Sequence, residues 1–183
     1  DGWAAIKYAL KYYPHRNAAA LNLILVTDED RDRVYRGIHY NQLLRQLKNH
    51  KALLNTVVDA AFYCEDGRSA LGMDAEGQGF VADGQGGYEV CSDAEVWYGE
   101  GNTIWDYVAL ALESGGAAWD IQYLREGGQY AQSFTQALLS IKAKEISNQP
   151  PSGEIIAIAN ATPNPAVVNQ TITLDASASN VSR

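Results

Sequence analysis

The sequence lacks a basic stripe and any long apolar run. It has 22 Asp and Glu residues against 14 Lys and Arg residues, a formal net charge of -8 over 183 residues. A nucleic-acid-binding surface needs clustered Lys and Arg to neutralise phosphates, so this balance argues against a nucleic-acid partner. No apolar stretch approaches the roughly 20 residues of a membrane-spanning helix. We therefore expect no membrane-spanning segment and no nucleic-acid binding.

Signatures of catalysis are also missing. The three histidines, His15, His39 and His50, lie in separate segments, and the sequence has neither an HExxH nor a GxSxG motif. These motifs carry metalloprotease and serine-hydrolase chemistry, and single Ser and His residues do not mark a triad. We expect a protein that is not an enzyme.

Cysteine is scarce, with Cys64 and Cys91 as the two examples. Neither belongs to a CxxC pair or has a His at metal-ligand spacing, which argues against a zinc site. The two residues bracket a Gly-rich stretch and are interpreted as one disulfide, with two unlinked buried thiols as the alternative. A disulfide indicates an oxidising compartment, so we expect an extracellular or cell-surface protein.

The most informative stretch that is present is LNLILVTDEDRD, residues 21–32. An apolar run of this kind predicts a strand buried on both faces of a parallel sheet between layers of helices. The charged residues follow at the carboxyl end, where such sheets bind ligands. We expect any binding chemistry to lie at Thr27 and Asp28.

The flanking segments predict an α/β fold. Apolar spacing predicts a helix over residues 2–13, ended by Pro14, and another over 40–50 with Asn41 as its cap. Residues 53–63 are rich in β-branched and aromatic side chains and predict a second buried strand. Strand, helix and strand in this order indicate a right-handed parallel crossover. The predicted fold is a partial doubly wound parallel sheet with flanking helices.

The Gly-rich stretch over about 64–102 predicts a hairpin insertion, with turns at 75–79 and 83–87. The segment from Asp74 partly resembles a calcium loop. Its twelfth position is Gln85, so no bidentate Glu closes the loop and we do not expect calcium there.

The composition divides the chain into two domains. Residues 1–148 form the predicted α/β domain, and a linker at 149–153 leads to a short β-sandwich-like segment at 154–183. Within the first part we predict further elements by their spacing: a helix at 103–114, a strand at 117–121 and a helix at 129–148.

Residues 1 to about 148 resemble the C-terminal half of a von Willebrand factor type A domain, closest to bacterial secreted members. The resemblance is carried by DGWAAIKYAL, ILVTDEDRD, LLNTVVDAAF and GGAAWDIQYLREGGQYAQSFTQALLSIKAKEI. The tail ATPNPAVVNQTITLDASAS is similar to the opening of a PKD-type immunoglobulin-like module. The resemblance implies a metal-ion-dependent adhesion site, with Mg²⁺ or Ca²⁺ bound at the strand ends of the intact protein.

In that family, three loops form the metal site. Only the third loop, an Asp after a central strand, matches this sequence, at Asp28 following Thr27. The DxSxS loop has no counterpart in the α/β part, and the spelling DASAS at 175–179 lies in the tail and is rejected as a site. The second-loop Thr would fall before Asp1. The resemblance therefore implies an incomplete metal site at Asp28, and the alternative for residues 28–30 is a solvated acidic turn.

Two other acidic residues stand at predicted strand ends. In one interpretation Asp59 and Asp120 face the same crevice as Asp28. The interpretation that we favour gives them structural roles such as helix capping.

These observations favour a non-enzymatic adhesion or ligand-binding module whose partner is a protein or matrix ligand. The alternative is a structural subunit of an extracellular filament or sheath, in which neighbouring chains complete each other's sheets by self-association. The sequence starts at Asp1 without Met or an apolar leader, so we expect any targeting signal to lie upstream or to have been removed.

Overall fold

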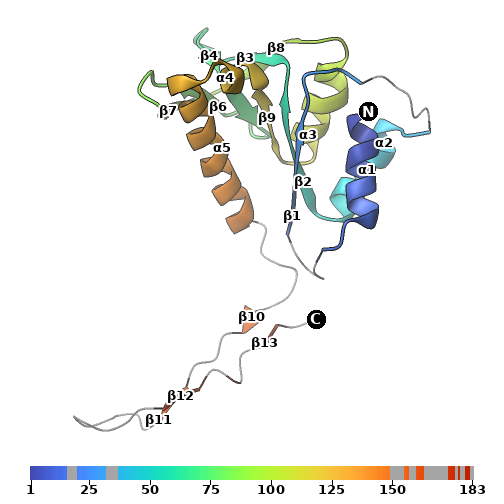
Figure 1. The fold of residues 1–183 in the computed structure, drawn as a ribbon, viewed down its shortest axis with the longest axis vertical. Helices are drawn as coiled ribbons and strands as arrows, with labels where there is room; N and C mark the ends of the chain where they lie inside the picture. Colours follow the sequence, from blue (N-terminus) through green and yellow to red (C-terminus); the bar gives the residue numbers. More distant parts are fainter. Residues whose placement is uncertain are drawn as a thin grey trace. The chain divides into compact units, whose positions relative to one another are not determined.

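The computed structural model describes residues 1–15, 20–31 and 37–148, and the short stretches 155–156, 160–162, 173–175, 177 and 180–181 (Figure 1). The chain forms two compact units, one of residues 1–14 and 21–148 and the other of residues 15–20 and 149–183. In the first unit the elements are α1 (Gly2–Tyr12), β1 (Leu21–Val26), α2 (Tyr40–Asn49), β2 (Ala52–Val58), β3 (Ala60–Tyr63), β4 (Ser69–Ala70), β5 (Gly72–Asp74), β6 (Gly79–Ala82), β7 (Tyr88–Cys91), β8 (Glu95–Gly99), the π-helical turn η1 (Ile104–Val108), α3 (Ala109–Glu113), β9 (Ala117–Asp120), α4 (Ile121–Glu126) and α5 (Gly128–Asn148).

The first unit is mixed α/β, built on a six-stranded sheet of order β1-β2-β9-β5-β6-β7. Strands β1, β2 and β9 are parallel, as predicted, whereas β5, β6 and β7 are antiparallel. The strands β5, β6 and β7 of the Gly-rich stretch therefore extend the main sheet, while β4 and β8 of the same stretch join a second sheet. Gly72 permits this pairing, because a Cβ there would lie 2.4 Å from the carbonyl oxygen of Ala118 on β9.

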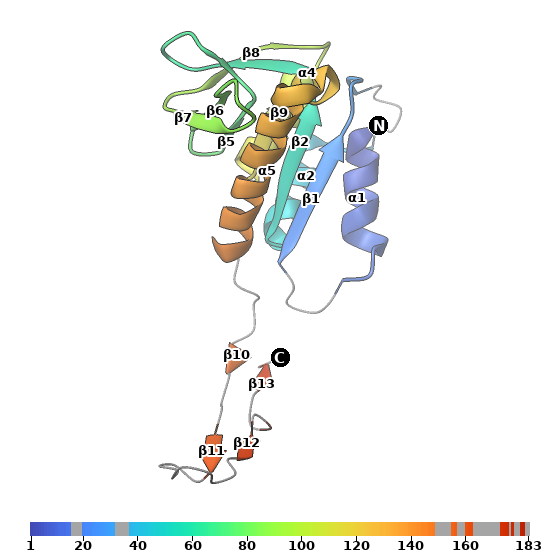
Figure 2. The same ribbon diagram turned by 60° about the vertical axis from the view of Figure 1, so that its left-hand side comes forward.

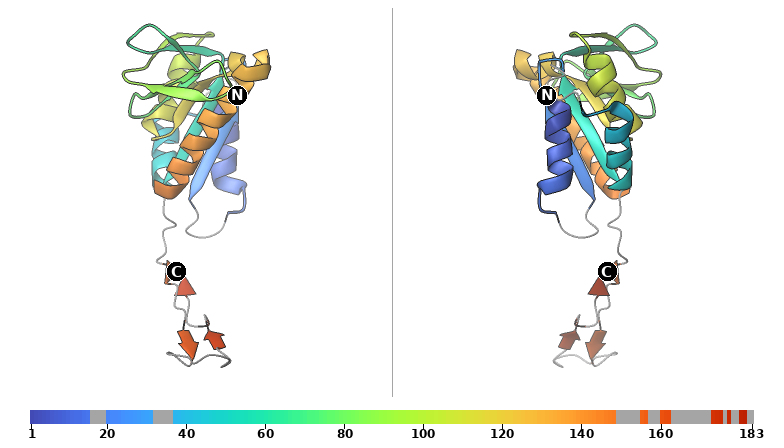
Figure 3. Two further views of the ribbon diagram at one scale, coloured as in Figure 1. Left: turned by 90° about the vertical axis from the view of Figure 1, so that its left-hand side faces the viewer. Right: turned by 90° about the vertical axis from the view of Figure 1, so that its right-hand side faces the viewer.

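Helices cover both faces of the sheet. Figure 3 shows α5 in front of one face, and α1, α2 and α3 in front of the other. The side chains of β2 alternate between the two resulting cores, with Leu54 and Val58 in the first and Val57 in the second. The second core centres on Trp119, which stacks on Phe80 with a centroid distance of 5.3 Å.

The predicted burial of β1 on both faces is wrong. Leu21, Leu23 and Leu25 pack on the first core, but Ile24 and Val26 on the opposite face are 52% and 58% exposed. β1 is an edge strand, and within the described ranges no strand pairs with its outer edge. The apolar run identified a strand correctly, but burial of its second face requires a covering element that the described chain does not supply.

The prediction of a single strand over 53–63 is also wrong. The chain bends at Asp59 and forms β2 in the main sheet and β3 in a second, three-stranded sheet of order β4-β3-β8. The backbone N–H of Glu100 bonds the Asp59 carbonyl oxygen at 3.0 Å, which holds this bend. Both predicted turns of the Gly-rich stretch are present, between β5 and β6 and between β6 and β7.

Cys64 and Cys91 form a disulfide, so the prediction of a linked pair is confirmed and the alternative of free thiols is wrong. Cys64 directly follows β3, and Cys91 is the last residue of β7. The bond therefore ties the three-stranded sheet to the main sheet. Gly79 of β6 leaves room for it, because a Cβ there would lie 2.5 Å from the Cys91 Sγ.

The predicted helices are present with three differences. The N-cap of α2 is His39 rather than Asn41 and makes no side-chain capping bond. The helix predicted over 103–114 begins with the π-helical turn η1 before α3. The short helix α4 had no sequence prediction, because its six residues are too few to show a periodic pattern.

The predictions for the C-terminal part lie partly outside the described residues. The linker predicted at 149–153 is outside them. In the second unit β10 (Ile155–Ile156) pairs antiparallel with β13 (Asn180–Val181), and β11 (Asn160–Thr162) with β12 (Thr173–Asp175). Asp175 of the rejected DASAS motif is the last residue of β12 and accepts a hydrogen bond from the Ser177 backbone N–H at 2.8 Å.

Candidate ligand-binding rim

The carboxyl ends of β1, β2 and β9 lie along one edge of the main sheet, because the three strands are parallel. Figure 2 shows the arrowheads of β1 and β2 pointing to this edge. Asp28, Asp59 and Asp120 stand at these ends, two residues after β1, directly after β2 and at the last position of β9. We call this edge the rim.

Thr27 and Asp28 occupy the rim at the end of β1. The Thr27 N–H donates to the Val57 carbonyl oxygen at 3.0 Å, and its Oγ1 accepts from the Glu29 N–H at 3.2 Å. Asp28 forms an ion pair with Arg125 of α4, and both side chains are about half exposed. The hydrogen bond and charge of the Arg125 guanidinium lower the pKa of Asp28.

Asp120 has the helix-capping role that the sequence favoured. Its Oδ1 accepts a hydrogen bond from the Gln122 N–H at 2.8 Å and so caps α4. The side chain is buried, and burial, with smaller contributions from the negative charges of Asp59 and Glu126, raises its pKa to about 6. A carboxyl group with this pKa is partly protonated in mildly acidic solution.

Residues 30 and 31, which follow Asp28, are held by contacts with other parts of the chain. Asp30 accepts a hydrogen bond from the Asn102 N–H at 3.3 Å. Arg31 pairs with Asp1 at 3.1 Å, and its guanidinium carbon lies 3.7 Å from the centroid of the Trp3 ring. The Asp1–Arg31 pair is buried, so the loop is attached to the start of α1 rather than free in solvent.

The rim residues of this chain do not by themselves fit a metal ion. Among the described residues, no group of three or more His, Cys, Asp and Glu side chains is arranged to hold one. Asp28 offers one carboxylate, which Arg125 already neutralises, whereas Mg²⁺ takes about six oxygen ligands. Any cation at Asp28 would need further ligands from outside the described residues.

Arg125 is the rim residue that the sequence did not single out. It pairs with a residue 97 positions away, and it lies on α4, which apolar spacing did not predict. The available signal was Asp120 at a strand end followed directly by helix-forming residues, which places a helix N-terminus at the rim.

None of the helices in the described part of the chain combines the length and apolarity needed to cross a lipid bilayer. Comparison with protein families, with curated proteins and with solved structures found no match to this chain.

Proposed function

We propose that the first unit is the C-terminal part of a von Willebrand factor type A-like module in an extracellular bacterial protein, and that it binds a protein or matrix ligand at the rim without catalysing a reaction. The three parallel strands, the helices on both faces and the strand-end aspartates support this assignment. The disulfide supports an oxidising, extracellular setting. The tail 154–183 is the start of a PKD-type module in this proposal.

The observation that carries the proposal is the open edge of β1. In a strand, N–H groups point alternately to the two sides, and the N–H of Thr27 points to β2. The N–H groups of Ile24 and Val26 therefore point away from β2, toward the unpaired edge. An edge strand of six residues with two exposed apolar side chains is a template for another strand.

The flank of α5 continues this uncovered apolar surface. Lys142 of α5 donates a hydrogen bond to Asn22 of β1 at 3.0 Å, so its face of the helix is turned toward β1. Leu139 and Ile146, three residues before and four after Lys142, share that face and are exposed. A strand beside β1 with a helix over Ile24 and Val26 would bury these side chains, as the proposed module requires.

If such a strand pairs with β1, it would bring further metal ligands to the rim beside the end of β1. Asp28 lies there, and a Mg²⁺ or Ca²⁺ ion would draw its other ligands from the segment that pairs with β1. The acidic group of the bound partner would complete the coordination. Arg125 would have to leave Asp28 for this to occur.

The test is adhesion of the natural protein to surfaces coated with collagen, fibronectin or laminin, in Mg²⁺ and in EDTA. We expect binding to one surface that is lost in EDTA and in Asp28→Ala. Lys144→Ala is the matched control, because Lys144 is an exposed charge on α5 away from the Asp28–Arg125 pair. Adhesion that persists both in EDTA and in Asp28→Ala would contradict a metal-dependent rim.

The open edge also supports a second candidate, a structural subunit of an extracellular filament or sheath. In that case a neighbouring copy supplies the strand beside β1. Light scattering after size exclusion distinguishes the two, since a filament subunit forms concentration-dependent oligomers that Ile24→Ser with Val26→Ser dissolves. A monomer at all concentrations would contradict the filament.

A further inference from the structure

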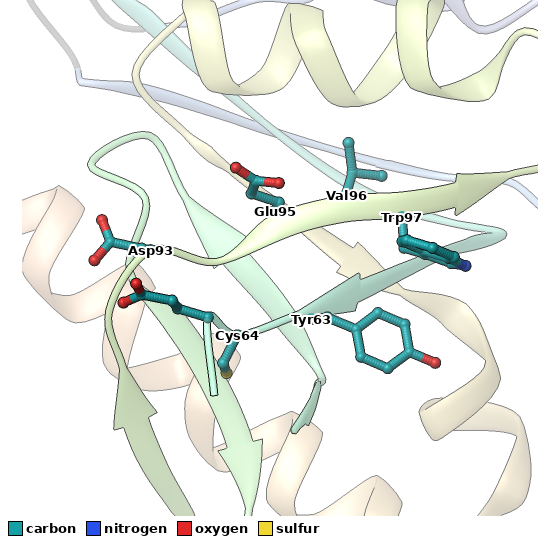
Figure 4. A pocket seen from close by; sticks show the side chains of 7 residues that line it. Tyr63, Cys64, Asp93, Glu95, Val96 and Trp97 are labelled. Carbon is teal, nitrogen blue, oxygen red and sulfur yellow. The ribbon is translucent and has the colours of Figure 1, made fainter. Parts of the chain in front are cut away.

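A second surface, separate from the strand-end aspartates, has the composition of a binding site. A hollow of about 370 Å³ is lined by residues of the paired strands β3 and β8 and of the segments next to the disulfide (Figure 4). Two aromatic residues, Tyr63 and Trp97, and three acidic residues, Glu65, Asp93 and Glu95, line it. Neither the rim nor the sheet edge involves these residues.

The aromatic pair presents open ring surface. Figure 4 shows the Tyr63 and Trp97 rings side by side, and they meet edge to face, with centroids 6.2 Å apart and planes at 74°. Trp97 is 78% exposed. Because Trp97 is mostly exposed, much of its indole surface is open to solvent, and the face of an indole is the strongest aromatic site for a cation.

A β-bulge directs Trp97 outward. Phe62 pairs with Val96 and Ala61 pairs with Tyr98, so Trp97 is the extra residue on β8 with no partner in the ladder. Phe62 is buried in the core, and Val96 packs against it. Bulges commonly turn a side chain toward a binding site, and this one places an exposed indole beside Tyr63.

The charge around the aromatic pair is negative and uncompensated. Glu95 lies directly opposite Tyr63 in the β3–β8 pairing, and Glu65 and Asp93 stand next to the two disulfide segments. In the described structure no Lys or Arg lines the hollow, and its three carboxylates have no ion-pair partner. The nearby Arg68 is already held by Asp66 and Glu89, both at 2.8 Å.

This combination selects an organic cation over a metal ion. The described acidic residues include no group arranged to coordinate a metal, and indole does not ligate one. Carboxylates beside an aromatic face instead suit an ammonium or guanidinium group on an apolar stem. The Cys64–Cys91 disulfide fixes two walls, so little ordering is needed on binding.

We propose that this hollow binds lysine or arginine side chains of a basic segment in a partner polypeptide. The hollow is open to water, and a single small cation would remain hydrated and gain little. Three separate carboxylates along one surface match several positive charges on one extended chain. Multivalent contact of this kind raises affinity without any one strong interaction.

The test is titration of the protein with hexalysine and with hexaarginine at low ionic strength, followed by calorimetry. Choline and hexaglutamate are the comparison ligands. We expect saturable binding of a basic peptide and none of hexaglutamate. Trp97→Ala should weaken the affinity about tenfold, because the cation then loses its aromatic contact. Glu95→Gln should weaken it several-fold and reduce its dependence on salt.

Trp105→Ala is the matched control. Trp105 is 73% exposed, close to the exposure of Trp97, but it does not line the hollow, so its loss should leave the affinity unchanged. Equal affinity of Trp97→Ala and the unaltered protein would overturn the proposal, since attraction to the net negative charge alone gives that result. Absence of basic-peptide binding, or binding of choline in preference to both peptides, would also overturn it. Far-ultraviolet circular dichroism verifies that each variant is folded.

Discussion

Asp28 and Asp120 lie at the same edge of the sheet, but their pKa values are shifted in opposite directions. Asp28 is in water beside Arg125, which lowers its pKa. Asp120 is buried beneath α4, and burial raises its pKa to about 6. The capping role of Asp120 was predictable, because a strand-end Asp before a helix is a local pattern. The pairing of Asp28 with Arg125 was not, because it joins residues that only the folded sheet brings together.

Because the pKa of Asp120 is raised, we expect Asp120→Asn to increase the free energy of unfolding by an amount that depends on pH. Between its ordinary pKa of 3.8 and about 6, the folded protein binds more protons than the unfolded chain, so the free energy of unfolding falls as pH rises through this window. Asn keeps the capping acceptor without the charge. At pH 7.5 the variant should be more stable by about 1–2 kcal/mol, which is below the full linkage value because water at the rim screens the charge. At pH 4 the two proteins should be nearly equal.

Urea unfolding at both pH values measures this difference. Asp28→Asn is the control of opposite sign. The lowered pKa of Asp28 contributes stability above its unfolded value, so this variant should be slightly less stable at pH 7.5. A gain from Asp120→Asn of the same size at pH 4 and pH 7.5 would show that the Asp120 charge is not responsible.

At the scale of elements, α5 is attached to the sheet by a buried polar cluster as well as by apolar packing. The Asn55 amide of β2 donates to both Glu145 carboxylate oxygens at 3.1 Å, and the Asn22 amide of β1 donates to one at 2.6 Å. Lys142 pairs with the same carboxylate. Burial lowers the pKa of Lys142, while the hydrogen bond and charge of Glu145 act in the opposite direction.

Glu145→Ala should therefore cost about 3 kcal/mol of unfolding free energy, because the buried Asn55 amide and Lys142 ammonium both lose the carboxylate, and Lys142 keeps the Asn22 oxygen as its acceptor but has no opposite charge in the cluster. Lys144→Ala is the matched control on the same helix. Lys144 is half exposed and meets Asp74 at 3.6 Å, so its loss should cost under about 1 kcal/mol. Chemical denaturation measures both variants, and equal costs would contradict the role given to the cluster.

The longer helices and two strands of the main sheet were predictable from local apolar spacing, whereas the pairing of β3 to β8 was not. Helices α1, α2 and α5 and strands β1 and β9 follow from apolar spacing, since each pattern is local. The division of 53–63 into β2 and β3 follows from pairing with β9 and β8, which lie far along the chain. The burial of β1 was mispredicted for the same reason, because a strand's exposure depends on its neighbours in space.

At the scale of the whole molecule, two surfaces are unfinished in the described structure. One is the edge of β1 with the exposed Ile24 and Val26, and the other is the hollow at Tyr63 and Trp97. The first is apolar with free backbone groups, which suits a strand and a helix. The second is acidic and aromatic, which suits a basic chain. Their different chemistry suits different binding segments.

The proposed binding site requires that a further strand extends the main sheet past β1. Amide hydrogen exchange of the natural protein, resolved by residue, tests it most directly. The N–H groups of Leu23 and Leu25 point to β2 and serve as internal controls. If a strand pairs with β1, the amides of Ile24 and Val26 should exchange as slowly as those of Leu23 and Leu25. Fast exchange at Ile24 and Val26 beside protected Leu23 and Leu25 would contradict the claim.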